Sequence, residues 1–203
     1  MPFEVNGTFP ESYWPFISET ITKAHGSNWN GLNIVSIGDQ DASCDEDNYV
    51  SKGANYTIIQ PAGADGALLL GRRSKNFIKR NFNNVDDFDQ YKGTFDVVIN
   101  LGSLEHIKNQ YKAWTITHNI CKPNGVMIHI MPDAYEVNMY LRWYGHCHNY
   151  FGVEFYEDLC NNMNYELLAN DLLHWNRSVG LKKLNDNEFN LNIEEFLSKI
   201  TIR

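Results

Sequence analysis

FDVVINLGSLEHI, from Phe95 to Ile107, is the stretch of this 203-residue chain that decides its fold. Its first half, FDVVIN, is rich in apolar and β-branched residues, as expected of a strand covered on both faces. Small and polar residues follow it, and from Glu105 to Ile120 apolar and aromatic side chains recur at helical spacing. We therefore predict a central strand, a loop and a helix, the repeating unit of an α/β protein.

Other segments extend this unit into a sheet. Four of them have the composition of strands, namely Leu32–Ile37, Tyr56–Gln60, Phe77–Arg80 and Val126–Met131. A short helix that Asp45 can cap and Gly53 can end separates the first two, and such a unit joins parallel neighbours through a right-handed crossover. The core of the sheet is therefore expected to be parallel.

The remaining segments frame the sheet. Helical spacing predicts helices over residues 11–25, 135–144, 153–163 and 193–200. Tyr165–Ala169 and Arg177–Leu184 lie too close in sequence for a crossover helix, so they predict an antiparallel hairpin. The expected fold is α/β: one doubly wound, mostly parallel seven-stranded sheet with an antiparallel C-terminal hairpin. It forms a single domain over residues 1–203, with a core over 30–184 and a C-terminal helical tail over 185–203.

Charge and composition narrow the classes of partner. The formal net charge of −8 opposes binding to nucleic acid, because such binding depends on Lys and Arg that neutralise phosphates. No segment has the length and apolarity of a membrane span, and the amino-terminal residues lack the pattern of a signal peptide. The four cysteines show no C-x-x-C spacing. We expect a soluble, cytoplasmic protein that acts on a small molecule and could form a homodimer.

Three features together resemble class I S-adenosylmethionine-dependent methyltransferases over roughly residues 30–184. They are the first strand ending in Gly38, FDVVINLGSLEHI, and CKPNGVMIHI from Cys121 to Ile130 followed by the predicted hairpin. The resemblance implies that S-adenosylmethionine is the cofactor. In open α/β sheets a ligand binds at the carboxyl ends of the strands where the strand order reverses, here beside the first and fourth strands.

The resemblance also implies which residues bind the cofactor. They are Gly38, Asp39 and Gln40 after the first strand, Gln60 after the second, Asn81 after the third, and Asn100, Leu101 and Gly102 after the fourth. Family members carry E-x-G-x-G-x-G in the first loop, whereas Gln40 and Ala42 stand at the second and third glycines here. Gln60 replaces an acidic residue that accepts the ribose hydroxyls. These changes cost roughly 2 to 3 kcal/mol together, which predicts either a weakened cofactor site or a lost one.

Histidine and glutamate side chains are the candidates for chemistry. His106, or His148 in the GHCHNYF segment, could accept a proton from a hydroxyl or amine acceptor, with Glu105 beside them. The structural alternatives are that Glu105 and His106 cap the following helix and that His146 and His148 pack in the core. Relatives that methylate small-RNA termini hold a metal with E-x-x-E-H and a later His, but Gly102 replaces the first of those glutamates, so we predict no metal.

Two hypotheses from different classes follow. The first is a methyltransferase for a small-molecule acceptor, and the second is a catalytically inactive methyltransferase-like binding module, which the altered glycine loop favours. A nicotinamide-dependent dehydrogenase ranks third, because the chain lacks the remaining glycines of the dinucleotide fingerprint.

Overall fold

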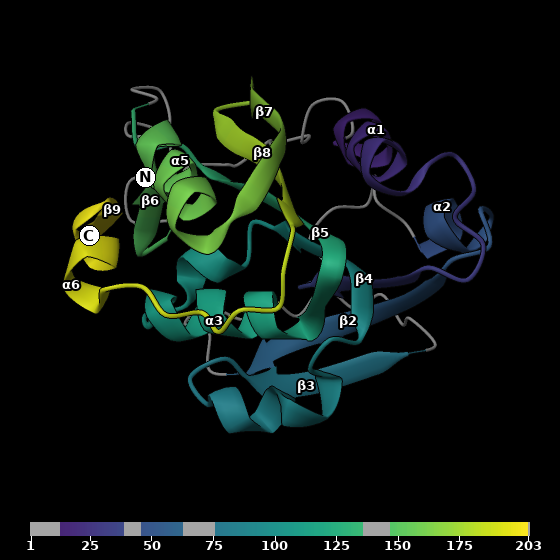
Figure 1. The fold of residues 1–203 in the computed structure, drawn as a ribbon, viewed down its shortest axis with the longest axis horizontal. Coiled ribbons are helices and arrows are strands. Elements are labelled where there is room, and N and C mark those ends of the chain that lie inside the picture. Colours follow the sequence, from purple (N-terminus) through teal and green to yellow (C-terminus); the bar gives the residue numbers. More distant parts are fainter. Residues whose placement is uncertain (1–12, 39–45, 63–75, 136–146, 203) are drawn as a thin grey trace, which may run out of the picture.

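The computed structural model describes residues 13–38, 46–62, 76–135 and 147–202. Seven strands form one sheet in the order β3-β2-β1-β4-β5-β8-β7, and β6 pairs with β9 in a separate two-stranded sheet (Figure 1). The strands are β1 (Asn33–Ile37), β2 (Asn55–Ala62), β3 (Phe77–Asn81), β4 (Phe95–Leu101), β5 (Cys121–Pro132), β6 (Asn149–Phe151), β7 (Tyr165–Leu173), β8 (Asn176–Lys183) and β9 (Ile200–Ile202).

The sheet is parallel from β3 to β5 and antiparallel at β8 and β7. The strand order reverses next to β1, because β1 pairs with β2 on one side and with β4 on the other. This arrangement confirms the predicted fold: a mostly parallel, seven-stranded α/β sheet with an antiparallel C-terminal hairpin in a single domain.

Helices cover both faces of the sheet. They are α1 (Trp14–His25), α2 (Glu46–Val50), η1 (Val85–Tyr91), η2 (Leu104–His106), α3 (Gln110–Ile120), α5 (Val153–Met163) and α6 (Ile193–Ser198). Apolar residues of α3 and α5 pack on one face around Trp114, and those of α1 and α2 pack on the other around Trp29. The sheet is therefore buried on both sides, which explains the continuous apolar runs of β1 and β4.

The predicted starts of α3 and β5 are wrong. The helix predicted from Glu105 is a 3-10 turn over Leu104–His106, and α3 begins only at Gln110 because the Asn109 side chain caps it by accepting from the Lys112 N–H at 3.0 Å. The CKPNG segment does not precede β5 but lies within it as an irregularity, with Asn124 at φ 63°.

The tail after residue 184 is not wholly helical. α6 ends at Ser198, and β9 follows it and pairs with β6. At the other end, the helix predicted over 11–25 is observed as α1, and residues 11 and 12 lie outside the described residues. The helix predicted over 135–144 lies almost entirely outside them as well, whereas α5 has the predicted bounds.

Candidate functional site

The carboxyl ends of β1 and β4 lie side by side, since Ile37 is paired with Asn100. Gly38 follows β1 with φ 70°, and its N–H donates to the Ile59 carbonyl of β2 at 2.8 Å. A Cβ at this position would overlap the Ser103 side chain in the loop after β4. The absence of a side chain at Gly38 therefore lets its left-handed backbone lie directly against Ser103 of the loop after β4.

Asn100 shapes the loop after β4. Its side chain is fully buried, and its Oδ1 accepts from the backbone N–H groups of Ser103 at 3.2 Å and Leu104 at 3.0 Å. Within the described part of the chain, its Nδ2 has no hydrogen-bond partner. Gly102 has φ 62° and donates its N–H to the Ile130 carbonyl at 3.0 Å, so Leu101 and Gly102 are held at the edge of the sheet.

The two predicted residues on the neighbouring strands also lie near this edge. Gln60 is half-buried near the end of β2, and Asn81 is the exposed last residue of β3. The Asn81 Oδ1 accepts from the Asn83 N–H at 2.9 Å. Asp39 and Gln40 lie outside the described residues. Gly38, whose backbone lies against Ser103, and the buried Asn100 Nδ2, which has no hydrogen-bond partner among the described residues, make this edge compatible with an adenosyl-type cofactor.

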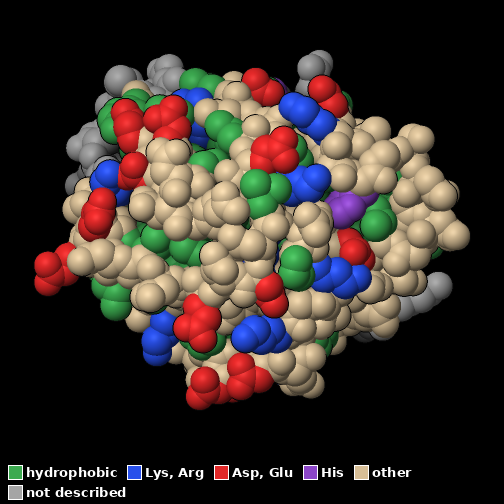
Figure 2. Space-filling model, in the orientation of Figure 1, with side chains coloured by type: hydrophobic (Ala, Val, Ile, Leu, Met, Phe, Trp, Pro, Cys, Tyr) green, Lys and Arg blue, Asp and Glu red, His purple; other side chains and the backbone are tan. Residues whose placement is uncertain are grey.

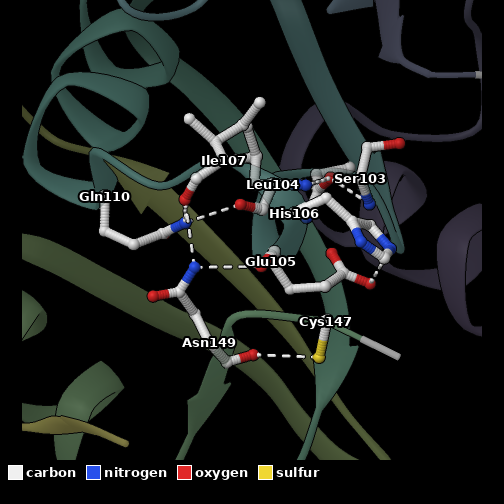
Figure 3. A network of polar contacts seen from close by, with 9 residues as sticks. Ser103, Leu104, Glu105, His106, Ile107, Gln110, Cys147 and Asn149 are labelled. Carbon is white, nitrogen blue, oxygen red and sulfur yellow. Dashed lines mark hydrogen bonds and ion pairs between the residues drawn. The ribbon is translucent and has the colours of Figure 1, made fainter. Parts of the chain in front are cut away.

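The η2 turn carries Glu105 and His106 directly after the β4 loop. Figure 3 shows their side chains turned toward one another, and the His106 Nε2 lies 4.0 Å from the Glu105 Oε1. Both residues are buried, with 2% and 6% exposure. The backbone N–H of His148 donates to the Glu105 carbonyl at 3.2 Å, so the three predicted residues come together. Glu105 does not cap α3, since Asn109 does so, and that alternative is wrong.

Burial decides the charge of Glu105. It raises the pKa of the Glu105 carboxyl from 4.5 to about 8, because removal from water disfavours the charged carboxylate. Burial, and secondarily the Glu105 charge, also raises the pKa of the Cys147 thiol to about 12 and holds that of the Tyr156 hydroxyl well above its usual range. Glu105 therefore holds a proton at neutral pH and is a hydrogen-bond donor there.

Sequence reasoning missed the side chains that hold this turn. Gln110 donates through Nε2 to the carbonyls of Leu104 and Ile107, and Asn149 donates through Nδ2 to the carbonyls of Glu105 and Ile107 (Figure 3). Gln110 opens α3 and Asn149 opens β6, so only the tertiary fold brings their amides together. In the sequence, the feature that could have indicated a role for Asn149 is its position next to the candidate residue His148.

The rest of the described chain adds two observations. No group of three or more metal-binding side chains occurs in the described ranges, which exclude His146, and no helix in them has the length and apolarity to cross a membrane. Acidic and basic side chains are interspersed over the face drawn in Figure 2. The charge of that face is thus mixed rather than gathered into one basic patch.

A family model described as a methyltransferase domain matches residues 32–184, which include every described strand from β1 to β8. A search of curated proteins finds no match. The family match spans the predicted core and both strands that form the candidate site.

Solved structures share the fold at low sequence identity. A chain from the complex between the Haloferax volcanii Trm112 methyltransferase activator and a methyltransferase has a TM-score of 0.61 at 12% identity, over 83% of this chain and 89% of that one. A Pyrococcus horikoshii protein has a TM-score of 0.57 at 13% identity, over 86% and 92%. The Burkholderia thailandensis 1,6-didemethyltoxoflavin-N1-methyltransferase, with bound 1,6-didemethyltoxoflavin and S-adenosylhomocysteine, has a TM-score of 0.54 at 10% identity, over 85% and 82%.

Proposed function

The chain belongs to the methyltransferase-domain family, whose model matches residues 32–184, and from this premise we propose that it transfers a methyl group from S-adenosylmethionine to a small-molecule acceptor. The observation that carries the proposal is the meeting of the β1 and β4 ends at Gly38, whose lack of a side chain lets its backbone lie against Ser103 of the loop after β4. Glu105, His106 and His148 gather beside the same loop.

The residues proposed to hold the cofactor are Gly38, Asp39, Gln40, Gln60, Asn81, Asn100, Leu101 and Gly102. S-adenosylmethionine, when bound, supplies an electrophilic methyl group on a sulfonium. The Gly38 and Gly102 backbones allow close approach, and Gln60 and Asn81 offer neutral amide groups rather than a carboxylate. Asn100 acts mainly by shaping the loop, since its Oδ1 already accepts from two backbone N–H groups.

The chain's own contribution to the chemistry is to align the acceptor and move its proton. The rate of methyl transfer depends mostly on the alignment of the attacking atom with the methyl group. Side chains that hold the acceptor in that alignment therefore contribute much of the rate. His106 or His148 accepts the proton of a hydroxyl or amine at neutral pH. Protonated Glu105 can donate a hydrogen bond to the acceptor, since the His106 Nε2 lies 4.0 Å from its Oε1, beyond hydrogen-bond distance.

Two observations support a small acceptor. Glu105 and His106 are almost completely buried, so a bulky polymer could not reach them without displacing the loop. The net charge of −8 also disfavours a nucleic acid partner. The solved Burkholderia relative, which has a small heterocycle bound, is consistent with this class of acceptor.

Calorimetric titration with S-adenosylhomocysteine tests the cofactor half of the proposal. Saturable binding with a dissociation constant on the order of a hundred micromolar is expected, because the altered glycine loop and Gln60 each weaken the site. The acceptor half is tested by incubating the protein with methyl-labelled S-adenosylmethionine and a small-metabolite extract, where the label should move into a low-molecular-weight product.

Variants then assign the roles. His106→Ala and His148→Ala should lower the rate of label transfer while leaving the dissociation constant of S-adenosylhomocysteine within about twofold. Absence of binding at millimolar ligand would instead support the inactive binding module. Binding without label transfer to any small molecule would contradict the proposed acceptor class.

A further inference from the structure

The loop that carries Glu105 and His106 contains a single 3-10 turn, which side-chain amides from neighbouring elements hold in place. From β4, Asn100 accepts the N–H groups of Ser103 and Leu104. From α3, the Gln110 Nε2 donates to the carbonyls of Leu104 and Ile107, each at 2.6 Å. These two amides are close in sequence to the turn and fix its two ends.

A third amide reaches the middle of the turn from far along the chain. The Asn149 Nδ2 donates to the Glu105 carbonyl at 2.9 Å and to the Ile107 carbonyl at 3.0 Å, and the residue is 1% exposed. The preceding residue, His148, adds its backbone N–H to the same Glu105 carbonyl at 3.2 Å. The segment that begins β6 therefore supplies both external donors to the Glu105 carbonyl.

Strand β9 holds β6 in place. Asn149 is paired with Ile202 and Phe151 with Ile200 in an antiparallel ladder that is separate from the main sheet. Phe151 and Ile200 are buried in the same core cluster as apolar residues of α3 and α5. The β6–β9 pair and its apolar anchors therefore help to fix the position of the Asn149 amide, together with the bridge from Phe151 to Asp133 that follows β5.

We propose that Asn149 is a positioning residue for the Glu105–His106 turn. Through Asn149, the β6–β9 pair determines the position of the Glu105 and His106 side chains relative to the methyl acceptor. The effect on catalysis rests on the proposed function. The mechanical part, namely that the Asn149 amide restrains the backbone of residues 103–107, can be tested without it. Asn149 touches neither reacting group; it acts through the carbonyls of the turn that presents them (Figure 3).

Removing this amide should loosen the turn without unfolding the protein. The Glu105 carbonyl keeps the His148 N–H, and the Ile107 carbonyl keeps the Gln110 Nε2. Neither buried carbonyl is left wholly without a donor, so the large penalty of an orphaned buried group is avoided. Asn149→Ala is therefore expected to stay folded.

Hydrogen exchange of the amides over residues 103–107 tests the mechanical part. Corrected for intrinsic rates, protection should fall at least tenfold in Asn149→Ala at both pH 8 and pH 5. Asn149→Asp should lose protection at pH 8 and regain part of it at pH 5, because a protonated carboxyl can donate one hydrogen bond and a carboxylate none. Glu105, whose pKa burial raises to about 8, is protonated at pH 5 and partly ionised at pH 8, but both variants share it. The other ionisable side chains around the turn, His106, Cys147 and His148, are likewise common to both variants.

The matched control is Asn162→Ala, which removes an exposed carboxamide bonded within α5. It should leave protection over 103–107 unchanged. Equal protection in Asn149→Ala and the native protein would overturn the proposal. So would equal behaviour of Asn149→Ala and Asn149→Asp across pH, since the acid-dependent rescue is specific to a donated hydrogen bond.

Thr201→Pro tests the contribution of β9, because proline disfavours the ladder that pairs residue 201 with Tyr150. The same loss of protection over 103–107 is expected. Native protection in this variant would overturn the part of the proposal that concerns the strand pair.

Label transfer from S-adenosylmethionine separates the inference from the proposed function. In Asn149→Ala the rate at saturating cofactor should fall at least tenfold, while the dissociation constant of S-adenosylhomocysteine stays within twofold. If the native protein binds no S-adenosylhomocysteine, the proposed function fails and the exchange result still decides the mechanical part. If binding is normal and the transfer rate of Asn149→Ala is native, the positioning role is contradicted.

Discussion

Gly38 combines two constraints that can be separated by mutation. It has a left-handed φ of 70°, and a Cβ there would strike Ser103. Gly31 has φ 80° with open space around it, so Gly31→Ala carries the backbone cost alone. Gly31→Ala should lose about 1 kcal/mol of unfolding free energy in urea titrations, and Gly38→Ala should lose more because its Cβ also strikes Ser103. Only Gly38→Ala should also raise the dissociation constant of S-adenosylhomocysteine, by at least tenfold, and equal affinities would argue against a cofactor at this edge.

Glu105 makes the stability of the protein depend on pH in a defined direction. Its pKa is about 8 in the folded state and near 4.5 in the unfolded state, so between these values the folded protein binds the extra proton. Stability from this residue is complete below pH 4.5 and is lost as pH rises toward 8, with a slope of up to about 1.4 kcal/mol per pH unit. Glu105→Gln removes the dependence.

The measurement is the difference in unfolding free energy between native protein and Glu105→Gln across pH 4.5 to 8.5. The fully buried His129, with pKa lowered to about 3 by burial, and His118, lowered to about 4, destabilise the fold in acid with the opposite slope. Both histidines are present in the two proteins and cancel in the difference. A difference that does not change with pH would mean that Glu105 is ionised in the fold.

The end of helix α5 shows how one residue sets an element boundary. Asn164 follows Met163 with φ 54° and ψ 50°, and its N–H donates to the Cys160 carbonyl. Glycine adopts this left-handed conformation without strain, and asparagine adopts it more readily than other residues. In most other residues the Cβ clashes with the backbone, which destabilises the fold. We expect Asn164→Ala to lower the unfolding free energy by about 1 kcal/mol and Asn164→Gly to leave it equal or higher, both in urea titrations.

Asn161→Ala is the matched control for that change. Asn161 is exposed within the same helix, where alanine is the better helix former, so its replacement should be neutral or slightly stabilising. A similar loss in both alanine variants would show that the left-handed conformation of Asn164 is not the cause.

Elements whose signal lies in their own residues could be predicted from sequence. FDVVIN is a nearly continuous apolar run and α5 has apolar residues at helical spacing, and the predicted bounds of both agree closely with the structure. The start of α3 was missed because the Asn109 cap outweighs the apolar spacing that continues back to Glu105. Strand β9 was missed because three residues carry no periodicity, and their conformation depends on pairing with β6. For the same reason the Glu105–His106 segment was predicted, whereas the amides of Gln110 and Asn149 that hold it were not.

At the scale of the whole molecule, a core on each face joins the helices to the same sheet, so we expect the domain to unfold cooperatively. Ligand binding at one edge of the sheet should therefore stabilise the entire domain. At a concentration a hundred times its dissociation constant, a ligand that binds only the folded state adds about 2.7 kcal/mol. For a domain of this size the melting temperature should then rise by roughly 5 to 10 °C. Both S-adenosylmethionine and S-adenosylhomocysteine should produce this shift in a thermal melt.

The comparison ligand is a nicotinamide dinucleotide, because it too would occupy the strand-order reversal of an α/β sheet. It should leave the melting temperature unchanged, and Gly38→Ala should need about tenfold more S-adenosylhomocysteine for the same shift. A rise with the dinucleotide and none with the sulfonium ligands would favour hydride transfer over methyl transfer. If S-adenosylhomocysteine raises the melting temperature of Gly38→Ala as much as that of the native protein at the same concentration, the ligand binds somewhere other than the β1–β4 edge.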